Sequence, residues 1–226
     1  MRVLPLKKLY RTLYRHFGPQ HWWPGDTPVE VMAGAILTQN TSWKNVERAI
    51  AALKKARKLS IAKLVETPQG ELACLIRSAG YFNVKARRLK AFFGWFLSEI
   101  GRRASYARRL DTAHLRDAML KQVSGVGPET ADSILLYALN RPVFVIDAYT
   151  RRILSRHGLP KAEHLKYENL QAVFESSLPM DVALYNEYHA LFVACGKLCG
   201  KKSPACRACP LDGVKITFPT GKWRRS

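Results

Sequence analysis

Apolar positions recur along most of the chain at the three- and four-residue spacing of helices. Residues 27–30, Thr-Pro-Val-Glu, form a capping-box pattern with proline at the first helical position, and the apolar run after them predicts a helix to about Leu37. Further helices are expected at about 41–55, within 61–78, at 84–100, from the N-cap Asp111 to Val123, and around 148–157, 165–177 and 182–196. No segment alternates convincingly enough to predict a sheet, so the expected fold class is all-α.

The most informative pattern is a pair of glycines that enclose one apolar residue. Residues 123–132 read Val-Ser-Gly-Val-Gly-Pro-Glu-Thr-Ala-Asp, and apolar residues continue beyond them at helical spacing. This predicts a helix, a tight turn and a second helix. Gly125, Val126 and Gly127 would then present backbone N–H groups at a helix N-terminus, which favours an anion such as a DNA phosphate. An ordinary turn between helices has the same pattern, so the flanking residues must decide between such a turn and a phosphate-binding hairpin.

Charge narrows the class of partner. The 226 residues include 37 Lys and Arg against 17 Asp and Glu, a formal net charge of +20, which is typical of proteins that bind nucleic acid. A merely cationic surface is the alternative. The longest apolar run, near 31–37, is too short to span a membrane, and residues 1–17 lack the apolar core of a signal peptide. We therefore expect an intracellular protein of the cytoplasm or nucleoid.

Four of the five cysteines lie within fifteen residues of the C-terminal region. Cys195, Cys199, Cys206 and Cys209 are separated by three, six and two residues. In an intracellular chain, cysteines clustered in this way indicate a metal site and not disulfides.

Together these motifs resemble those of helix-hairpin-helix DNA glycosylases of the endonuclease III superfamily. The hairpin sequence is followed, eighteen residues after Glu129, by Asp147 in Val-Ile-Asp. Residues 35–41, Ala-Ile-Leu-Thr-Gln-Asn-Thr, and residues 80–86, Gly-Tyr-Phe-Asn-Val-Lys-Ala, match two further family segments. The resemblance covers most of the chain and is greatest to the 3-methyladenine glycosylase subgroup, which residues 22–24, Trp-Trp-Pro, also resemble.

The resemblance implies two helical lobes and a C-terminal iron–sulfur cluster loop. Residues 28–135 are expected to form a six-helix barrel lobe that ends in the helix-hairpin-helix motif. Residues 1–27 and 136–226 are expected to form the second lobe, with the cysteine cluster.

The resemblance also implies the catalytic residues. Asp147 matches the family's catalytic aspartate, although an N-cap is its alternative role. Glu129 stands where glycosylases that also cut the strand carry a lysine, and a carboxylate cannot form a Schiff base. Lys121 is a poor substitute because it precedes the hairpin. We therefore expect hydrolysis without AP lyase activity. Glu129 and the tryptophans Trp22, Trp23 and Trp43 are the expected base-pocket residues, with core packing as the alternative for the tryptophans.

An enzyme that cleaves a base from DNA must first flip that base out of the stack. Gln39 and Tyr81 match the family positions that fill the resulting gap, although Tyr81 can also be read as an ordinary aromatic residue. Asn83 and Lys85, in the same loop and the helix after it, are further expected DNA contacts.

Three of the clustered cysteines, Cys199, Cys206 and Cys209, match family ligands of a [4Fe–4S] cluster. The fourth family position is occupied by Lys215, and Cys195 stands one helical turn before Cys199 instead. We expect a re-routed four-cysteine [4Fe–4S] site, with zinc or a lost site as alternatives.

The expected function is excision of a damaged base, such as 3-methyladenine, from double-stranded DNA by a monomeric glycosylase. Three alternatives stay open: a glycosylase for mismatched or deaminated pyrimidines, an endonuclease III-type glycosylase with lyase activity, and a non-catalytic protein that binds damaged DNA.

Overall fold

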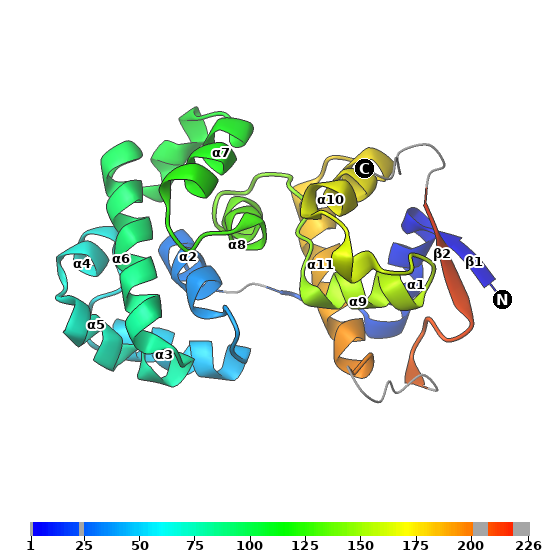
Figure 1. Cartoon of the computed structure of the whole chain (residues 1–226), viewed down its shortest axis with the longest axis horizontal. Helices are drawn as coiled ribbons and strands as arrows, with labels where there is room; N and C mark the ends of the chain where they lie inside the picture. Colours follow the sequence, from blue (N-terminus) through cyan, green and yellow to red (C-terminus); the bar gives the residue numbers. More distant parts are fainter. Residues whose placement is uncertain (1, 23–24, 201–207, 219–226) are drawn as a thin grey trace. The chain divides into compact units, whose positions relative to one another are not determined.

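The computed structural model describes residues 2–22, 25–200 and 208–218, and in these residues it is helical except for one short sheet. The all-α class is therefore confirmed. The chain divides into two compact units (Figure 1). Residues 23–141 form the first, which we call the hairpin unit, and residues 1–22 with 142–226 form the second, the terminal unit.

The hairpin unit is built from helices, and side chains cap the N-termini of some of them. It contains α2 (Pro28–Leu37), α3 (Trp43–Lys55), α4 (Ile61–Glu66), α5 (Gln69–Leu75), η1 (Arg77–Ala79), α6 (Phe82–Glu99), η2 (Ala104–Arg109), α7 (Thr112–Gln122), α8 (Pro128–Ser133) and η3 (Ile134–Ala138). Thr27 Oγ1 accepts a hydrogen bond from Glu30 N at 3.2 Å, so the predicted cap of α2 is confirmed. Asp111 caps α7 in the same way, at 2.9 Å from His114 N.

Helix α6 provides much of the core of the hairpin unit. Phe92, Phe93 and Phe96 on this helix are buried, and α4 and α5 pack alongside it (Figure 1). The sequence pattern within 61–78 predicted a single helix, but the chain breaks between α4 and α5 at Thr67-Pro68. Proline lacks the N–H that a continuous helix needs, and it pushes Thr67 into the extended region, with ψ at 129°.

The terminal unit contains a buried aromatic cluster. Its elements are β1 (Arg2–Pro5), α1 (Leu6–Phe17), α9 (Ala148–Arg156), η4 (Ala162–His164), α10 (Tyr167–Ser177), α11 (Val182–Leu198) and β2 (Val214–Thr217). The rings of Phe144 and Phe174 stack with centroids 4.1 Å apart, and those of Tyr188 and Phe192 stack at 5.0 Å. The cluster joins α10 and α11 to the extended segment that precedes α9.

The sheet and α1 are elements that the sequence analysis does not predict. Strands β1 and β2 pair in parallel, with Arg2 opposite Val214 and Pro5 opposite Thr217, although they lie at opposite ends of the chain. Residues 214–217, Val-Lys-Ile-Thr, do alternate, with Val214 and Ile216 buried, but so short a segment is not enough to predict a strand. No helix among the described residues is both long and apolar enough to cross a membrane.

Candidate functional site

The turn between α7 and α8 requires glycine at one of its two glycine positions. Gly125 has a φ of +86°, which L side chains rarely adopt, and a Cβ there would also collide with the side chain of Arg88. Gly127 has an ordinary φ of −97°, and a Cβ there would meet no atom within 4 Å. Val126, between them, is 6% exposed and anchors the turn in the core. The second glycine therefore borders open space, where another molecule can approach the backbone closely.

Gln39 is fixed against this turn by both ends of its amide. Its Nε2 donates to Gly125 O at 3.1 Å and to Thr130 Oγ1 at 3.0 Å. Its Oε1 accepts a hydrogen bond from Arg88 Nη1. The structure thus brings together the end of α2, the hairpin and α6 around one side chain.

Tyr81 is the most exposed aromatic among the sequence-predicted residues of the hairpin unit. Its side chain is 73% exposed, and its φ is +45°, a left-handed conformation that is uncommon for a bulky residue. Gly80 before it also has a positive φ, of +68°, and Asn83 lies exposed in the first turn of α6. The tight turn presents Tyr81 and Asn83 to solvent.

The position of Lys85 in the structure does not fit its predicted role as a DNA contact. Its side chain is 2% exposed, and its Nζ donates to Leu37 O at 2.8 Å and to Ala79 O at 2.7 Å. Burial, and then the charge of Arg88, lower the pKa of Lys85. Its ammonium is used inside the protein, so the expectation of a direct DNA contact is corrected. Lys85 instead ties together the two loops that carry Gln39 and Tyr81.

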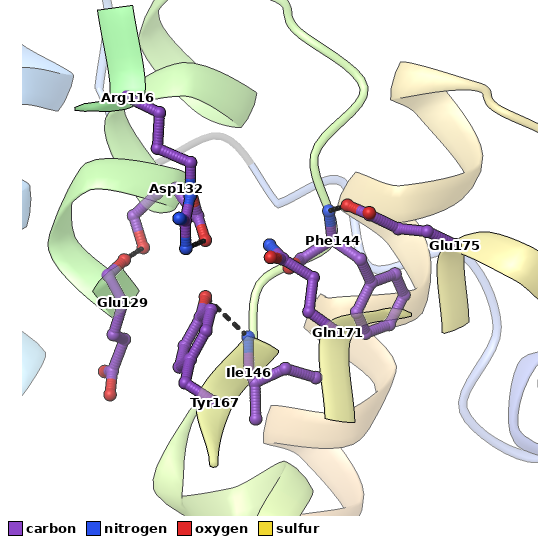
Figure 2. A network of polar contacts seen from close by, with 9 residues as sticks. Arg116, Glu129, Asp132, Phe144, Ile146, Tyr167, Gln171 and Glu175 are labelled. Atoms are coloured by element: carbon purple, nitrogen blue, oxygen red, sulfur yellow. Dashed lines mark hydrogen bonds and ion pairs between the residues drawn. The ribbon is translucent and has the colours of Figure 1, made fainter. Parts of the chain in front are cut away.

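Glu129 lies exposed in the first turn of α8, where its main-chain carbonyl accepts a hydrogen bond from Ser133 Oγ at 2.7 Å. Three residues later, Asp132 is fully buried and forms a bidentate ion pair with Arg116 of α7, at 2.6 and 3.0 Å (Figure 2). This pair holds the two helices of the hairpin together. Lys121 is exposed and forms an ion pair with Asp117 at 2.8 Å.

In the terminal unit, a buried extended segment leads to Asp147. Three of its backbone groups bond to side chains of α10, which Figure 2 draws as sticks. Phe144 N donates to Glu175 Oε1 at 2.9 Å, and Phe144 O accepts from Gln171 Nε2 at 2.8 Å. Ile146 N donates to Tyr167 Oη at 3.2 Å. The three partners recur every four residues on α10, so one face of that helix fixes the backbone just before Asp147.

Asp147 is the N-cap of α9, as its position in the sequence predicts. The residue is 8% exposed, and its Oδ1 accepts from Thr150 N at 2.7 Å. Its Oδ2 lies 3.5 Å from Nε2 of His189 on α11. Burial alone would raise the pKa of Asp147, but the facing His189 and the Thr150 N–H outweigh it and hold this pKa below its usual value. The carboxyl group is therefore ionised at neutral pH.

The tryptophans lie in different surroundings. Trp22 is half-buried, and its ring centroid lies 6.0 Å from that of His189, so it belongs to the same group as Asp147. Trp43 is 36% exposed at the start of α3, and its ring packs close to Gly34, where an added Cβ would lie 3.4 Å from Cη2. Trp23 lies outside the described residues.

Three of the four clustered cysteines are described, and Cys206 lies outside the described residues. The Sγ atoms of Cys195 and Cys209 are 3.9 Å apart, and Cys199 Sγ accepts from Arg156 Nη1 at 2.8 Å. The hydrogen bond from Cys195 lowers the pKa of Cys209 to about 6. In the part of the chain that the structure describes, no three His, Cys, Asp or Glu side chains are close enough to hold a metal ion.

His189 and Arg88 are site residues that the sequence analysis misses. His189 lies in a mostly apolar stretch of α11, where a histidine is usually a core residue with a satisfied ring. The only feature of the local sequence that could have identified His189 as a site residue is that it is a titratable residue in a mostly apolar stretch. Arg88 is one of several basic residues on α6, and nothing in the sequence separates it from its neighbours.

Comparisons with known proteins identify the family of this chain. Residues 33–179 match the family described as HhH-GPD superfamily base excision DNA repair protein. A protein of Methanocaldococcus jannaschii, provisionally named a DNA repair glycosylase, is 48% identical over 90% of this chain and 92% of its own. A thymine/uracil-DNA glycosylase of Pyrobaculum aerophilum is 29% identical over 91% of this chain and 87% of its own.

A solved structure is also similar. The H. pylori 3-methyladenine DNA glycosylase MagIII, bound to 1,N6-ethenoadenine, has a TM-score of 0.65 and 26% identity, covering 86% of this chain and 96% of that one. The chain belongs to the HhH-GPD superfamily of base excision DNA repair proteins, and within it the chain is a DNA glycosylase.

Proposed function

We propose that this glycosylase excises alkylated purines, such as 3-methyladenine, by hydrolysis, with Asp147 as its catalytic carboxylate. The observation that carries the proposal is the environment of Asp147. A buried, ionised carboxylate whose oxygens are fixed by Thr150 N and faced by His189 is suited to stabilising positive charge on a deoxyribose.

The proposed step balances without a cofactor. The bond between C1′ and the base nitrogen breaks, its electron pair leaves with the base, and the oxygen of a water molecule bonds to C1′. Asp147 stabilises the cationic sugar and accepts the proton that the water loses. An N3-alkylated adenine carries a positive charge before cleavage and leaves as a neutral base, so this departure needs no general acid.

Trp22 is the proposed partner for such a cationic base. An electron-rich indole face attracts a positively charged ring through the cation–π interaction, which contributes about 0.5–2 kcal/mol. Trp22 lies in the same group as Asp147 and His189, and it is half-buried, so part of its ring surface is accessible. Trp23, Trp43 and Glu129 stay proposed members of the base pocket.

Double-stranded DNA with a damaged base is the proposed substrate, and the monomer is the proposed active form. The backbone around Gly125, Val126 and Gly127 is proposed to hold a phosphate, since Gly127 borders open space. Gln39, Tyr81 and Asn83 are proposed to enter or contact the duplex after base flipping. The high exposure and left-handed backbone of Tyr81 support this role.

We also propose that Cys195, Cys199, Cys206 and Cys209 hold a structural [4Fe–4S] cluster. The donor chemistry fits, because soft thiolates are the ligands of iron–sulfur clusters. They are equally the ligands of zinc, and at a Zn–S distance of about 2.3 Å tetrahedral zinc separates two sulfurs by about 3.8 Å, close to the 3.9 Å between Cys195 and Cys209. Metal analysis of anaerobically purified protein decides between them: about four irons per chain support the cluster, and one zinc without iron overturns it.

A panel of substrates tests the choice of lesion. Free-base release is measured from methylated DNA and from duplexes carrying 1,N6-ethenoadenine, uracil opposite guanine, thymine opposite guanine, or an oxidised pyrimidine. We expect the largest single-turnover rate constants for the alkylated purines. A deaminated or mismatched pyrimidine is the second candidate, because the P. aerophilum relative is a thymine/uracil-DNA glycosylase, and a larger rate constant for uracil or thymine would replace the first proposal with the second.

A further inference from the structure

His189 is a buried polar residue that takes no part in the bond-breaking or proton-transfer steps of the proposed reaction. Its side chain is 8% exposed, and the adjacent residues of α11, Tyr188, Ala190 and Leu191, are also buried. Burying an imidazole costs free energy unless its ring nitrogens find partners. One of these nitrogens, Nε2, faces Asp147 Oδ2 at 3.5 Å.

Other charged groups of the elements around this pair are directed elsewhere. On α9, Arg151 donates to the carbonyls of Ala162 and Leu165, and Arg152 donates to those of Gly196 and Cys199. On α11, Glu187 accepts from Gln20 N at 2.7 Å. On α10, Tyr167 and Glu175 bond to the backbone before Asp147. Among the described residues, His189 is therefore the titratable group that faces Asp147.

We propose that His189 is a positioning residue: the neutral ring, whose Nε2 lies 3.5 Å from Oδ2, aims the ionised carboxylate of Asp147 at the sugar, and an imidazolium in its place offsets the charge of that carboxylate and turns the enzyme off. The inference rests on the proposed role of Asp147. Thr150 N–H holds Oδ1 and His189 faces Oδ2, so together they fix the plane of the carboxylate.

The neutral ring is the working form because of the charge that the pair presents. A carboxylate beside neutral imidazole carries a net charge of −1, which stabilises a cationic sugar. A carboxylate beside imidazolium is neutral overall, and in a buried site that loss of charge weakens the stabilisation strongly. The rate of excision should therefore fall when the pair takes up a proton, and the pH dependence of the rate measures this.

The test compares two substitutions at position 189. His189→Gln keeps an N–H donor but removes the titration, and His189→Leu removes both. Single-turnover excision is measured from pH 5 to 9, with subtraction of spontaneous base loss. We expect His189→Gln to retain activity within about tenfold at pH 7.5, with an acid limb that lies below that of the wild type and reports only the protonation of Asp147. We expect His189→Leu to be at least about a hundredfold slower, with its acid limb about 1–3 pH units above that of His189→Gln.

His157→Gln is the matched control. His157 is a half-buried histidine of the same unit, and its Nδ1 contacts Val214 O at 3.0 Å, away from Asp147. Its substitution should leave the acid limb of excision unchanged. If the Gln and Leu variants at 189 share one profile, or if His189→Gln keeps the wild-type acid limb, the proposed positioning role is wrong.

A second readout needs neither DNA nor activity. Titration of the Asp147 carboxyl carbon by NMR, assigned with Asp147→Asn, should show a higher pKa in His189→Leu than in the wild type. An unchanged pKa would reject the coupling of His189 to Asp147 even if the preferred lesion were not an alkylated purine. Conversely, a raised pKa in a protein that releases no base from any duplex would retain the coupling and reject the proposed function.

Discussion

Asp147 and Glu129 both stand at the start of a helix, where the helix dipole favours a carboxylate, yet their surroundings assign them different chemistry. Asp147 is buried and faces His189, whereas Glu129 is exposed on α8. The sequence locates both residues through their spacing from the glycines of the hairpin. The sequence could not reveal the role of His189, because α9 and α11 are distant in the chain and come together only on folding.

The absence of an amine at position 129 predicts the product of the reaction. Strand cleavage in this superfamily requires a lysine that forms an imine with the sugar, and a glutamate cannot do so. We expect wild-type protein to leave an intact abasic site that breaks only in hot alkali, and borohydride to trap no covalent adduct. Glu129→Lys is the comparison variant, which should gain weak trapping. Efficient trapping of the wild type would contradict the hydrolytic mechanism and direct attention to Lys121.

Removing a positive charge from α6 should have different effects at Lys85 and at Arg87. Lys85→Met leaves the carbonyls of Leu37 and Ala79 without their buried donor, which costs about 1–3 kcal/mol of unfolding free energy for each carbonyl. Arg87 is exposed, so Arg87→Met should change stability by less than about 0.5 kcal/mol and weaken DNA binding instead. Denaturant unfolding and DNA titration of both variants measure this. Equal stability of the two proteins would refute the buried role of Lys85.

At the scale of elements, capping residues were the most reliable signal in the sequence. Thr27, Asp111 and Asp147 each cap the helix that they were predicted to begin. The apolar run 143–146 lies in neither a helix nor a strand, and its backbone partners on α10 could not be predicted. Those partners come from one face of a helix that begins some twenty residues later, and periodicity does not show what that face contacts.

Because side chains of α10 hold the backbone just before Asp147, we expect substitutions on this face of α10 to affect both stability and catalysis. Gln171→Leu leaves the buried Phe144 carbonyl without its 2.8 Å donor, and we expect a loss of about 1–3 kcal/mol in unfolding free energy. We also expect slower excision, because the backbone before Asp147 loses one of its fixed points. Asn169→Leu, at an exposed position of the same helix, is the control and should change neither property. A Gln171→Leu protein as stable and active as the control would show that α10 does not hold this segment.

At the scale of the whole molecule, the net charge of +20 makes DNA affinity dependent on salt. Each phosphate neutralised by lysine or arginine releases counterions, so the logarithm of the binding constant falls by about 0.9 per contact for each unit of log salt concentration. We expect a slope steeper than about −4 for undamaged and damaged duplexes alike. Fluorescence anisotropy between 50 and 300 mM salt measures it, and an affinity independent of salt would mean that the charge serves another purpose.

The most direct measurement of hydrolysis by this protein is the single-turnover release of free methylated purine by the wild type and by Asp147→Asn, from the same methylated duplex at pH 7.5. Replacing the ionised carboxylate with a neutral amide of the same shape removes its stabilisation of the cationic sugar and its capacity to accept a proton. We expect Asp147→Asn to bind the damaged duplex as tightly as the wild type but to release base at least about a hundredfold more slowly. Release by Asp147→Asn at the wild-type rate would contradict the catalytic role of Asp147.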